Sequence, residues 1–133
     1  ILVGVSGRGE FLAIQLSKVI QKISNIKIKI GVVDLDKDNP CQSLITVSLD
    51  QKDYANKVVI LVDDVLNSGK TLMYAARHFL CASILSLSVA VLVERKHSRF
   101  PIRADYIGLS LATTLQEYIT VVLDGPHQGV YLS

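Results

Sequence analysis

Two neighbouring carboxylates stand where an apolar run of the sequence gives way to a short polar turn. Residues 57–62 are apolar after their first lysine, and Asp63 and Asp64 follow them directly. Carboxylates at the end of a buried strand are costly unless they meet hydrogen-bond donors or a cation. The pair therefore points to a site for a ligand at this end of the strand.

The turn after the carboxylates carries groups that suit an anion. Ser68 and Thr71 supply hydroxyls, and Gly69 lets the backbone come close to a ligand. Residues 71–80 have helical spacing, so unpaired N–H groups stand at the start of a helix. Such a helix start favours an anion by roughly 0.3–1 kcal/mol for a single charge. Carboxylates followed by an anion cradle suit a ligand with hydroxyls beside a phosphate, such as ribose 5-phosphate.

Three other interpretations of the loops in this sequence can be considered. The simplest is an ordinary capped helix, with Asp64 or Ser68 as the N-cap and Asp63 in solvent. A Walker A loop is excluded, because Asp64 stands where that motif needs its first glycine. A dinucleotide-binding fingerprint over residues 4–9 is excluded as well, because its middle glycine is Ser6.

The elements that position these turns alternate between strand-like and helix-like patterns. Strands are predicted at residues 1–5, 26–32, 44–49, 57–62 and 87–93, with shorter β-like runs at 104–111, 118–123 and 130–132. Helices are predicted from residue 12 to 23 and from 71 to 80, while 34–43 and 63–70 are predicted to be loops or turns. This order predicts an α/β fold with a mainly parallel, twisted sheet flanked by helices. Ligands of such folds bind beyond the carboxyl ends of the strands.

Composition limits the possible classes of protein. The 133 residues predict one domain, and with 50% hydrophobic and 20% charged residues a disordered chain is excluded. No apolar run approaches the roughly 20 residues that span a bilayer, and the net charge of +2 does not require nucleic acid or a membrane as partner. Cys41 and Cys81 lie far apart, which predicts reduced thiols in a cytoplasmic protein. Because the chain begins with Ile1 and its one methionine is Met73, we expect it to lack its natural N-terminal segment.

Residues 59–71, VILVDDVLNSGKT, closely resemble the phosphoribosyl pyrophosphate-binding motif of type I phosphoribosyltransferases. Two further segments resemble one branch of that family, the pyrimidine-operon regulator/uracil phosphoribosyltransferases. They are LVGVSGRG at residues 2–9, followed by FLA at 11–13, and VLVERKHSRFPIRADYIG at 91–108. The sequence departs from this branch at Gly7, Glu94 and Lys96, where threonine, aspartate and glycine are usual, and in the shortness of the loop at 34–43.

The resemblance implies a role for each matched residue. Asp63 and Asp64 would hold the ribose hydroxyls and lie near Mg²⁺. The 5-phosphate would lie in the cradle formed by Val65, Leu66, Asn67, Ser68, Gly69, Lys70 and Thr71. The pyrophosphate would be received by Ser6, Gly7, Arg8 and Gly9. The implied reaction moves ribose 5-phosphate from phosphoribosyl pyrophosphate to a nucleobase, with Asp63, Asp64 and Arg8 as the catalytic residues.

The resemblance leaves the base and the biological role open. Asn67 stands where 6-oxopurine enzymes usually have an aspartate, and asparagine cannot act as an acid or base. This argues against hypoxanthine, guanine and xanthine and leaves pyrimidines, adenine or regulation without turnover open. The resemblance to the branch makes uracil the leading base. Arg95 and His97, which follow a predicted strand, are the predicted base-pocket residues.

The alternative function is a nucleotide-sensing regulator that binds RNA and has little or no turnover. Its RNA contacts would come from Arg95, Lys96, His97, Arg99 and Arg103, although a solvated loop explains such a basic cluster equally well. For either function, the resemblance implies a homodimer.

Overall fold

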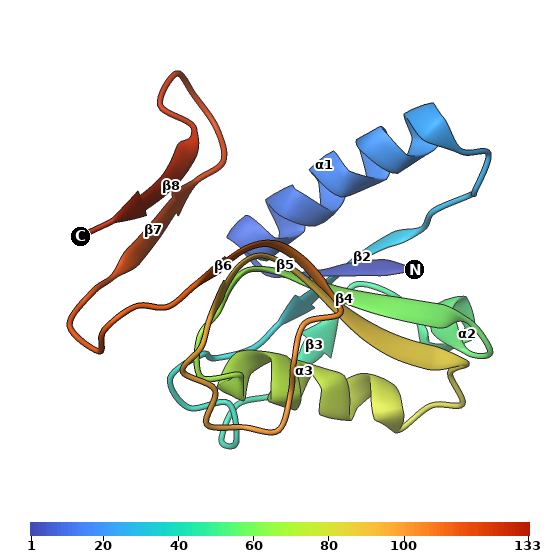
Figure 1. The fold of residues 1–133 in the computed structure, drawn as a ribbon. Coiled ribbons are helices and arrows are strands. Elements are labelled where there is room, and N and C mark those ends of the chain that lie inside the picture. The colour runs from blue at the N-terminus through green and yellow to red at the C-terminus, as the bar shows by residue number, and fades with distance from the viewer.

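The computed structural model describes residues 1–133 and contains a six-stranded sheet with the strand order β3-β2-β1-β4-β5-β6. Its strands are β1 (Leu2–Val5), β2 (Ile30–Asp34), β3 (Thr46–Val47), β4 (Val58–Leu66), β5 (Ser86–Arg95) and β6 (Tyr106–Leu111). All neighbouring strands run parallel except β2 and β3. Helices α1 (Arg8–Ile23) and α3 (Lys70–Leu80) cover opposite faces of the sheet (Figure 1). The predicted α/β fold with a mainly parallel sheet is confirmed. None of the helices combines the length and the apolar character needed to cross a membrane.

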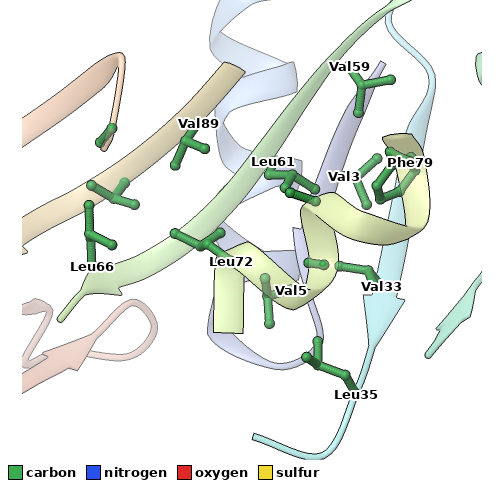
Figure 2. Packing of buried hydrophobic residues seen from close by; sticks show 14 of the residues in the cluster. Val3, Val5, Val33, Leu35, Val59, Leu61, Leu66, Leu72, Phe79 and Val89 are labelled. Carbon is green, nitrogen blue, oxygen red and sulfur yellow. The ribbon is translucent and has the colours of Figure 1, made fainter. Parts of the chain in front are cut away.

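The main core lies between the sheet and α3 (Figure 2). The central strands are wholly apolar up to the carboxylates, as expected for parallel strands that are buried on both faces. Their buried side chains meet one face of α3, formed by Leu72, Ala75, Ala76 and Phe79. Their spacing in the sequence, three or four residues apart, is that of one helix face. A smaller cluster on the other face of the sheet contains Leu2, Ala13, Val62 and Ala90.

The strand β4 is longer than predicted. The sequence predicted a turn from residue 63, but the pairing with β5 continues through Asp63↔Val91 to Leu66↔Glu94. Asp63 and Asp64 therefore belong to the strand, and only residues 67–69 form the turn. The prediction was wrong because the length of a strand depends on its neighbour, and β5 extends to Arg95.

Other elements also differ from the prediction, among them α1, which begins at Arg8 and not at residue 12. The strand predicted at residues 26–32 is β2, which begins only at Ile30, because its partner β1 begins at Leu2 and pairs with it there. The strand predicted at residues 44–49 is reduced to β3. A short helix, α2 (Gln51–Tyr54), was not predicted, and its start is held by a hydrogen bond from the Asp50 N–H to the Asp53 carboxylate.

The C-terminal hairpin stands outside the main sheet. It consists of β7 (Ile119–Val122) and β8 (Gly129–Leu132), which pair antiparallel from Ile119↔Leu132 to Val122↔Gly129. In Figure 1 it lies beyond one end of the sheet, near the first turn of α1. The hairpin thus brings residues 121–124 to the region where β1 leads into α1.

Candidate functional site

The two predicted motifs meet at the point where the sheet reverses its direction of growth. β1 pairs with β2 on one side and with β4 on the other, and all three strands are parallel. In open α/β sheets, ligands bind in the crevice beyond the carboxyl ends of the strands at such a switch point. Residues 6–9 follow β1, and Asp63 and Asp64 lie in the last part of β4. The topology therefore brings these two segments, which are far apart in the sequence, to the same edge of the sheet.

Arg8 and Asp64 form an ion pair across this crevice. The Arg8 Nη1 atom lies 3.3 Å from the Asp64 Oδ2 atom, and the side chains are 57% and 12% exposed, respectively. Gly9 allows this approach, because a Cβ atom there would lie 2.6 Å from the Val62 carbonyl oxygen and 3.2 Å from the Asp63 Oδ1 atom. The start of α1 therefore packs directly against the carboxylate end of β4.

Burial and the charge of its neighbour alter the acidity of Asp63. Desolvation, followed by the charge of Asp64, raises the pKa of Asp63 from its ordinary value to about 7, while Lys37 opposes the change. The Asp64 N–H donates to the Asp63 Oδ1 atom at 2.9 Å. Asp63 and Asp64 are buried side by side, and Arg8 forms an ion pair with one of them. A further cation would balance the negative charge that remains.

The turn between β4 and α3 is concave. A hollow of about 60 Å³ is lined by Asp63 and residues 65–72, which include the whole predicted phosphate cradle. Gly69 adopts a left-handed conformation with φ of 83°, and the Lys70 N–H donates to the Ser68 Oγ atom at 3.3 Å. The N-cap of α3 is Gly69, and no side chain caps it. The simpler interpretation of an N-cap at Asp64 or Ser68 is therefore wrong, and the first turn of α3 opens toward the hollow.

A segment that follows β5 braces this turn from behind. The Ser68 carbonyl oxygen accepts hydrogen bonds from the N–H groups of Arg99, at 2.9 Å, and Phe100, at 3.0 Å. A Cβ atom on Gly69 would lie only 2.6 Å from the Cγ2 atom of Ile102. Sequence reasoning considered only the basic side chains of this segment and missed its backbone role. The apolar residues Phe100 and Ile102 among the basic ones were the available signal.

The basic cluster does not form one surface. Arg95 is buried, and its Nε atom donates to the Thr113 Oγ1 atom at 2.8 Å, while Nη2 donates to the carbonyl oxygens of Thr114 and Glu117, each at 2.9 Å. The His97 ring contacts the Thr113 carbonyl oxygen. The other three basic residues, Lys96, Arg99 and Arg103, are exposed. Arg95 and His97, the two predicted base-pocket residues, thus come together, but both contact the segment of residues 113–117 that leads to β7.

The start of α1 also faces the C-terminal hairpin. A hollow of about 370 Å³ is lined by Gly7, Arg8 and Phe11 on one side and by residues 121–124 on the other. Asp124 at the end of this stretch is exposed and lines the hollow together with Arg8. No sequence pattern linked the hairpin to residues 6–9, because their contact depends on how the chain turns after β6.

The comparisons with known proteins agree with this geometry. The family described as "Phosphoribosyl transferase domain" matches residues 1–123. The chain belongs to this family. The "Bifunctional protein PyrR" of Staphylococcus carnosus (strain TM300) is 35% identical over 128 residues, which are 91% of this chain and 73% of that protein. The protein of the same name from Macrococcus caseolyticus (strain JCSC5402) is 35% identical over 131 residues, 93% of this chain and 75% of its own length. The resemblance to this branch of the phosphoribosyltransferases is confirmed.

Solved structures of phosphoribosyltransferases share the fold. The hypoxanthine phosphoribosyltransferase of Trypanosoma cruzi superposes with a TM-score of 0.71 at 18% identity, over 89% of this chain and 63% of that one. The hypoxanthine phosphoribosyltransferase of Staphylococcus aureus gives a TM-score of 0.64 at 20% identity, over 83% and 60%. At these identities, the likeness concerns the fold alone.

The carboxylate pair of this phosphoribosyltransferase fits the Mg²⁺ ion that its family implies. Mg²⁺ is commonly held by one or two carboxylates together with substrate oxygens and water, rather than by a cage of protein ligands. Asp63 and Asp64 offer such carboxylates. Burial, followed by the charge of Asp64, raises the pKa of Asp63, and a bound cation would favour its ionised form. No group of three or more His, Cys, Asp or Glu side chains comes together in the structure. Oxygen atoms of the donor would complete the coordination.

Proposed function

We propose that the protein transfers ribose 5-phosphate from phosphoribosyl pyrophosphate to a nucleobase, with uracil as the leading base, and releases pyrophosphate. The observation that carries this proposal is the ion pair between Arg8 and Asp64 at the switch point of the sheet. It joins the pyrophosphate-side residues, Ser6, Gly7, Arg8 and Gly9, to the ribose-side residues, Asp63 and Asp64. The hollow lined by Asp63 and residues 65–72 would take the 5-phosphate.

Catalysis in this arrangement consists of positioning and electrostatic stabilisation. The bond between ribose C1 and the pyrophosphate oxygen breaks, the bond between C1 and the base nitrogen forms, and the proton of that nitrogen is released to solvent. C1 becomes cationic as pyrophosphate leaves, and the carboxylates of Asp63 and Asp64 stabilise that charge from the ribose side. Arg8 stabilises the negative charge on the leaving group. When bound, Mg²⁺ supplies further charge neutralisation at the pyrophosphate.

The choice of base rests on Asn67 and on the relatives. Asn67 is exposed in the turn that forms the cradle, and its amide cannot exchange a proton with a purine ring. The relatives at 35% identity carry the name "Bifunctional protein PyrR". For this chain we propose uracil, with the base lying on the side of the cleft toward Arg95 and His97. Because the hypoxanthine phosphoribosyltransferases share only the fold with this chain, their substrate does not indicate its base.

A second candidate function is regulation through RNA. It is favoured by three exposed basic side chains, Lys96, Arg99 and Arg103, within eight residues of the chain. Side chains of this kind contact the phosphates of RNA. Both candidate functions are consistent with a cytoplasmic homodimer, which we include in the proposal.

An activity assay with labelled donor and a panel of bases tests the reaction. We expect turnover with uracil that requires Mg²⁺, and little or none with hypoxanthine or guanine. Calorimetry separates donor binding from turnover: the double substitution Asp63→Asn/Asp64→Asn should greatly weaken binding of phosphoribosyl pyrophosphate in Mg²⁺. If the unaltered protein binds no 5-phosphoribosyl compound, the proposed function is wrong. Efficient turnover of hypoxanthine would refute the choice of base.

A further inference from the structure

A buried arginine at the end of β5 holds the chain that leads into the C-terminal hairpin. Arg95 is the last residue of β5 and pairs in register with Leu111, the last residue of β6. The chain leaves the sheet after Leu111, and residues 113–117 return to the Arg95 side chain. Its guanidinium group donates three hydrogen bonds of 2.8–2.9 Å to Thr113, Thr114 and Glu117.

The segment that Arg95 holds is itself a closed turn. The Thr114 N–H donates to the Glu117 carboxylate, and the Glu117 N–H donates to the Thr114 carbonyl oxygen at 3.3 Å. His97 contacts the same turn at the Thr113 carbonyl oxygen. The planar guanidinium fork matches three acceptors in fixed directions, which a lysine ammonium cannot reproduce.

These contacts are the hydrogen-bonded attachment of the hairpin to the rest of the protein. Every hydrogen bond between residues 113–133 and residues 1–112 comes from Arg95 or His97. The other hydrogen bonds of the hairpin are internal, such as the pair between the backbones of Tyr118 and Ser133. Beyond the turn, the hairpin packs through Val121, which is 2% exposed.

We infer that Arg95 is a positioning residue that fixes the hairpin β7–β8 over the pyrophosphate side of the active site, and that it acts on pyrophosphate binding without contacting the substrate. The hairpin supplies one wall of the hollow that Arg8 and Phe11 line on the other side. The Arg8 side chain is already half in solvent, so if the hairpin moves away the remaining wall beside it is lost and the attraction between its charge and an anion is screened further. This inference deepens the proposed function, since it takes residues 6–9 as the pyrophosphate site.

Binding of two ligands, pyrophosphate and ribose 5-phosphate, distinguishes an effect of the hairpin from an effect of the phosphate cradle. In Arg95→Ala, calorimetry in Mg²⁺ should give a pyrophosphate dissociation constant raised by about tenfold, because the wall of the hollow opposite Arg8 is then no longer held in place. Ribose 5-phosphate should bind with an unchanged dissociation constant, because its cradle is braced by the backbone of residues 99 and 100 instead. Arg77→Ala, which removes an exposed arginine from α3, is the matched control and should change neither constant.

Amide hydrogen exchange supplies a readout that requires no ligand. Arg95→Ala should accelerate exchange in β7 and β8 and leave β1, β4 and α3 unchanged. Arg95→Lys, which keeps the charge but not the fork, should give an intermediate acceleration and an intermediate pyrophosphate affinity. If Arg95→Ala is too unstable to purify, Arg95→Lys and Thr113→Val take its place in both measurements. Thr113→Val removes one acceptor of the Arg95 hydrogen bonds, and both variants should change exchange and pyrophosphate affinity less than Arg95→Ala.

Several results would overturn the inference. Unchanged exchange in the hairpin would show that Arg95 does not hold it. Unchanged pyrophosphate binding despite faster exchange would show that the hairpin does not shape that site. A rise in KM for uracil alone, with unchanged exchange and pyrophosphate binding, would make Arg95 a base-contacting residue. If the unaltered protein binds neither ligand, the proposed function is wrong, whereas the exchange result still decides whether Arg95 holds the hairpin.

Discussion

Arg8 and Asp64 are 56 residues apart in the sequence, yet the Arg8 Nη1 atom lies 3.3 Å from the Asp64 Oδ2 atom. The pair joins the loop after β1 to the end of β4 at the switch point of the sheet. Because the Arg8 side chain is more than half exposed, the pair contributes little to stability, at most about 1 kcal/mol. In the proposed function, the pair places a positive charge beside two carboxylates at the mouth of the site.

Removing that charge should affect pyrophosphate more than ribose 5-phosphate. In Arg8→Gln we expect pyrophosphate in Mg²⁺ to bind about tenfold or more weakly, because a hydrogen bond to a charged group is worth about 1.5–3 kcal/mol. Ribose 5-phosphate should bind as before, and the free energy of unfolding should change by less than about 1 kcal/mol. Calorimetry and urea denaturation measure these quantities. An equal loss of affinity for both ligands would contradict the separate roles of residues 6–9 and 65–71.

The buried carboxylate of Asp63 predicts a pH dependence of stability. Its folded pKa of about 7 lies above its ordinary value of 3.8, so folding favours the protonated form. The stability that this carboxyl contributes is present below about pH 4 and is lost as the pH rises through about 7. In EDTA, Asp63→Asn should therefore be more stable than the unaltered protein at pH 8, and this advantage should shrink toward pH 5. Urea denaturation at the two pH values checks the sign, and Asp50→Asn at an exposed site is the control.

The sequence predicted the parallel sheet and the two loops of the site because those features depend on local residues. Apolar runs form the buried strands, and Ser68 and Gly69 determine the turn that follows β4. The extent of β4 was not predictable in the same way, because it depends on pairing with the end of β5. The partners of Arg95 lie 18 to 22 residues further along the chain, in a stretch without a readable pattern. Its burial therefore emerged only from the structure.

Gly69 should be irreplaceable for two separate reasons. Its φ of 83° disfavours any side chain, and a Cβ atom would lie 2.6 Å from the Ile102 Cγ2 atom. Gly125 is a matched control, with φ of 77° and nothing within 4 Å of a Cβ atom. Each alanine variant should lose about 1–2 kcal/mol of unfolding free energy from the left-handed conformation. Gly69→Ala should lose more than Gly125→Ala, and it alone should weaken ribose 5-phosphate binding. Equal behaviour of the two variants would mean that the brace behind the cradle has no role.

The exposed basic residues should distinguish an enzyme from an RNA-binding regulator. We expect the triple variant Lys96→Gln/Arg99→Gln/Arg103→Gln to keep its turnover with uracil, because these side chains are exposed and the backbone brace to Ser68 is preserved. If the cluster binds RNA, the affinity should fall, and the salt dependence of log K should flatten by about 0.7 for each phosphate of single-stranded RNA that the variant no longer neutralises.

Arg95 is left unaltered in this experiment, because its guanidinium group is buried against residues 113–117 and cannot reach a macromolecule at the surface. Filter binding to RNA at several salt concentrations, beside a turnover assay, measures both properties on one sample. A loss of RNA affinity with unchanged turnover would assign the cluster to regulation and the switch-point site to catalysis. A loss of turnover, with no measurable RNA binding by the unaltered protein, would instead place these side chains at the substrate and contradict the regulatory candidate.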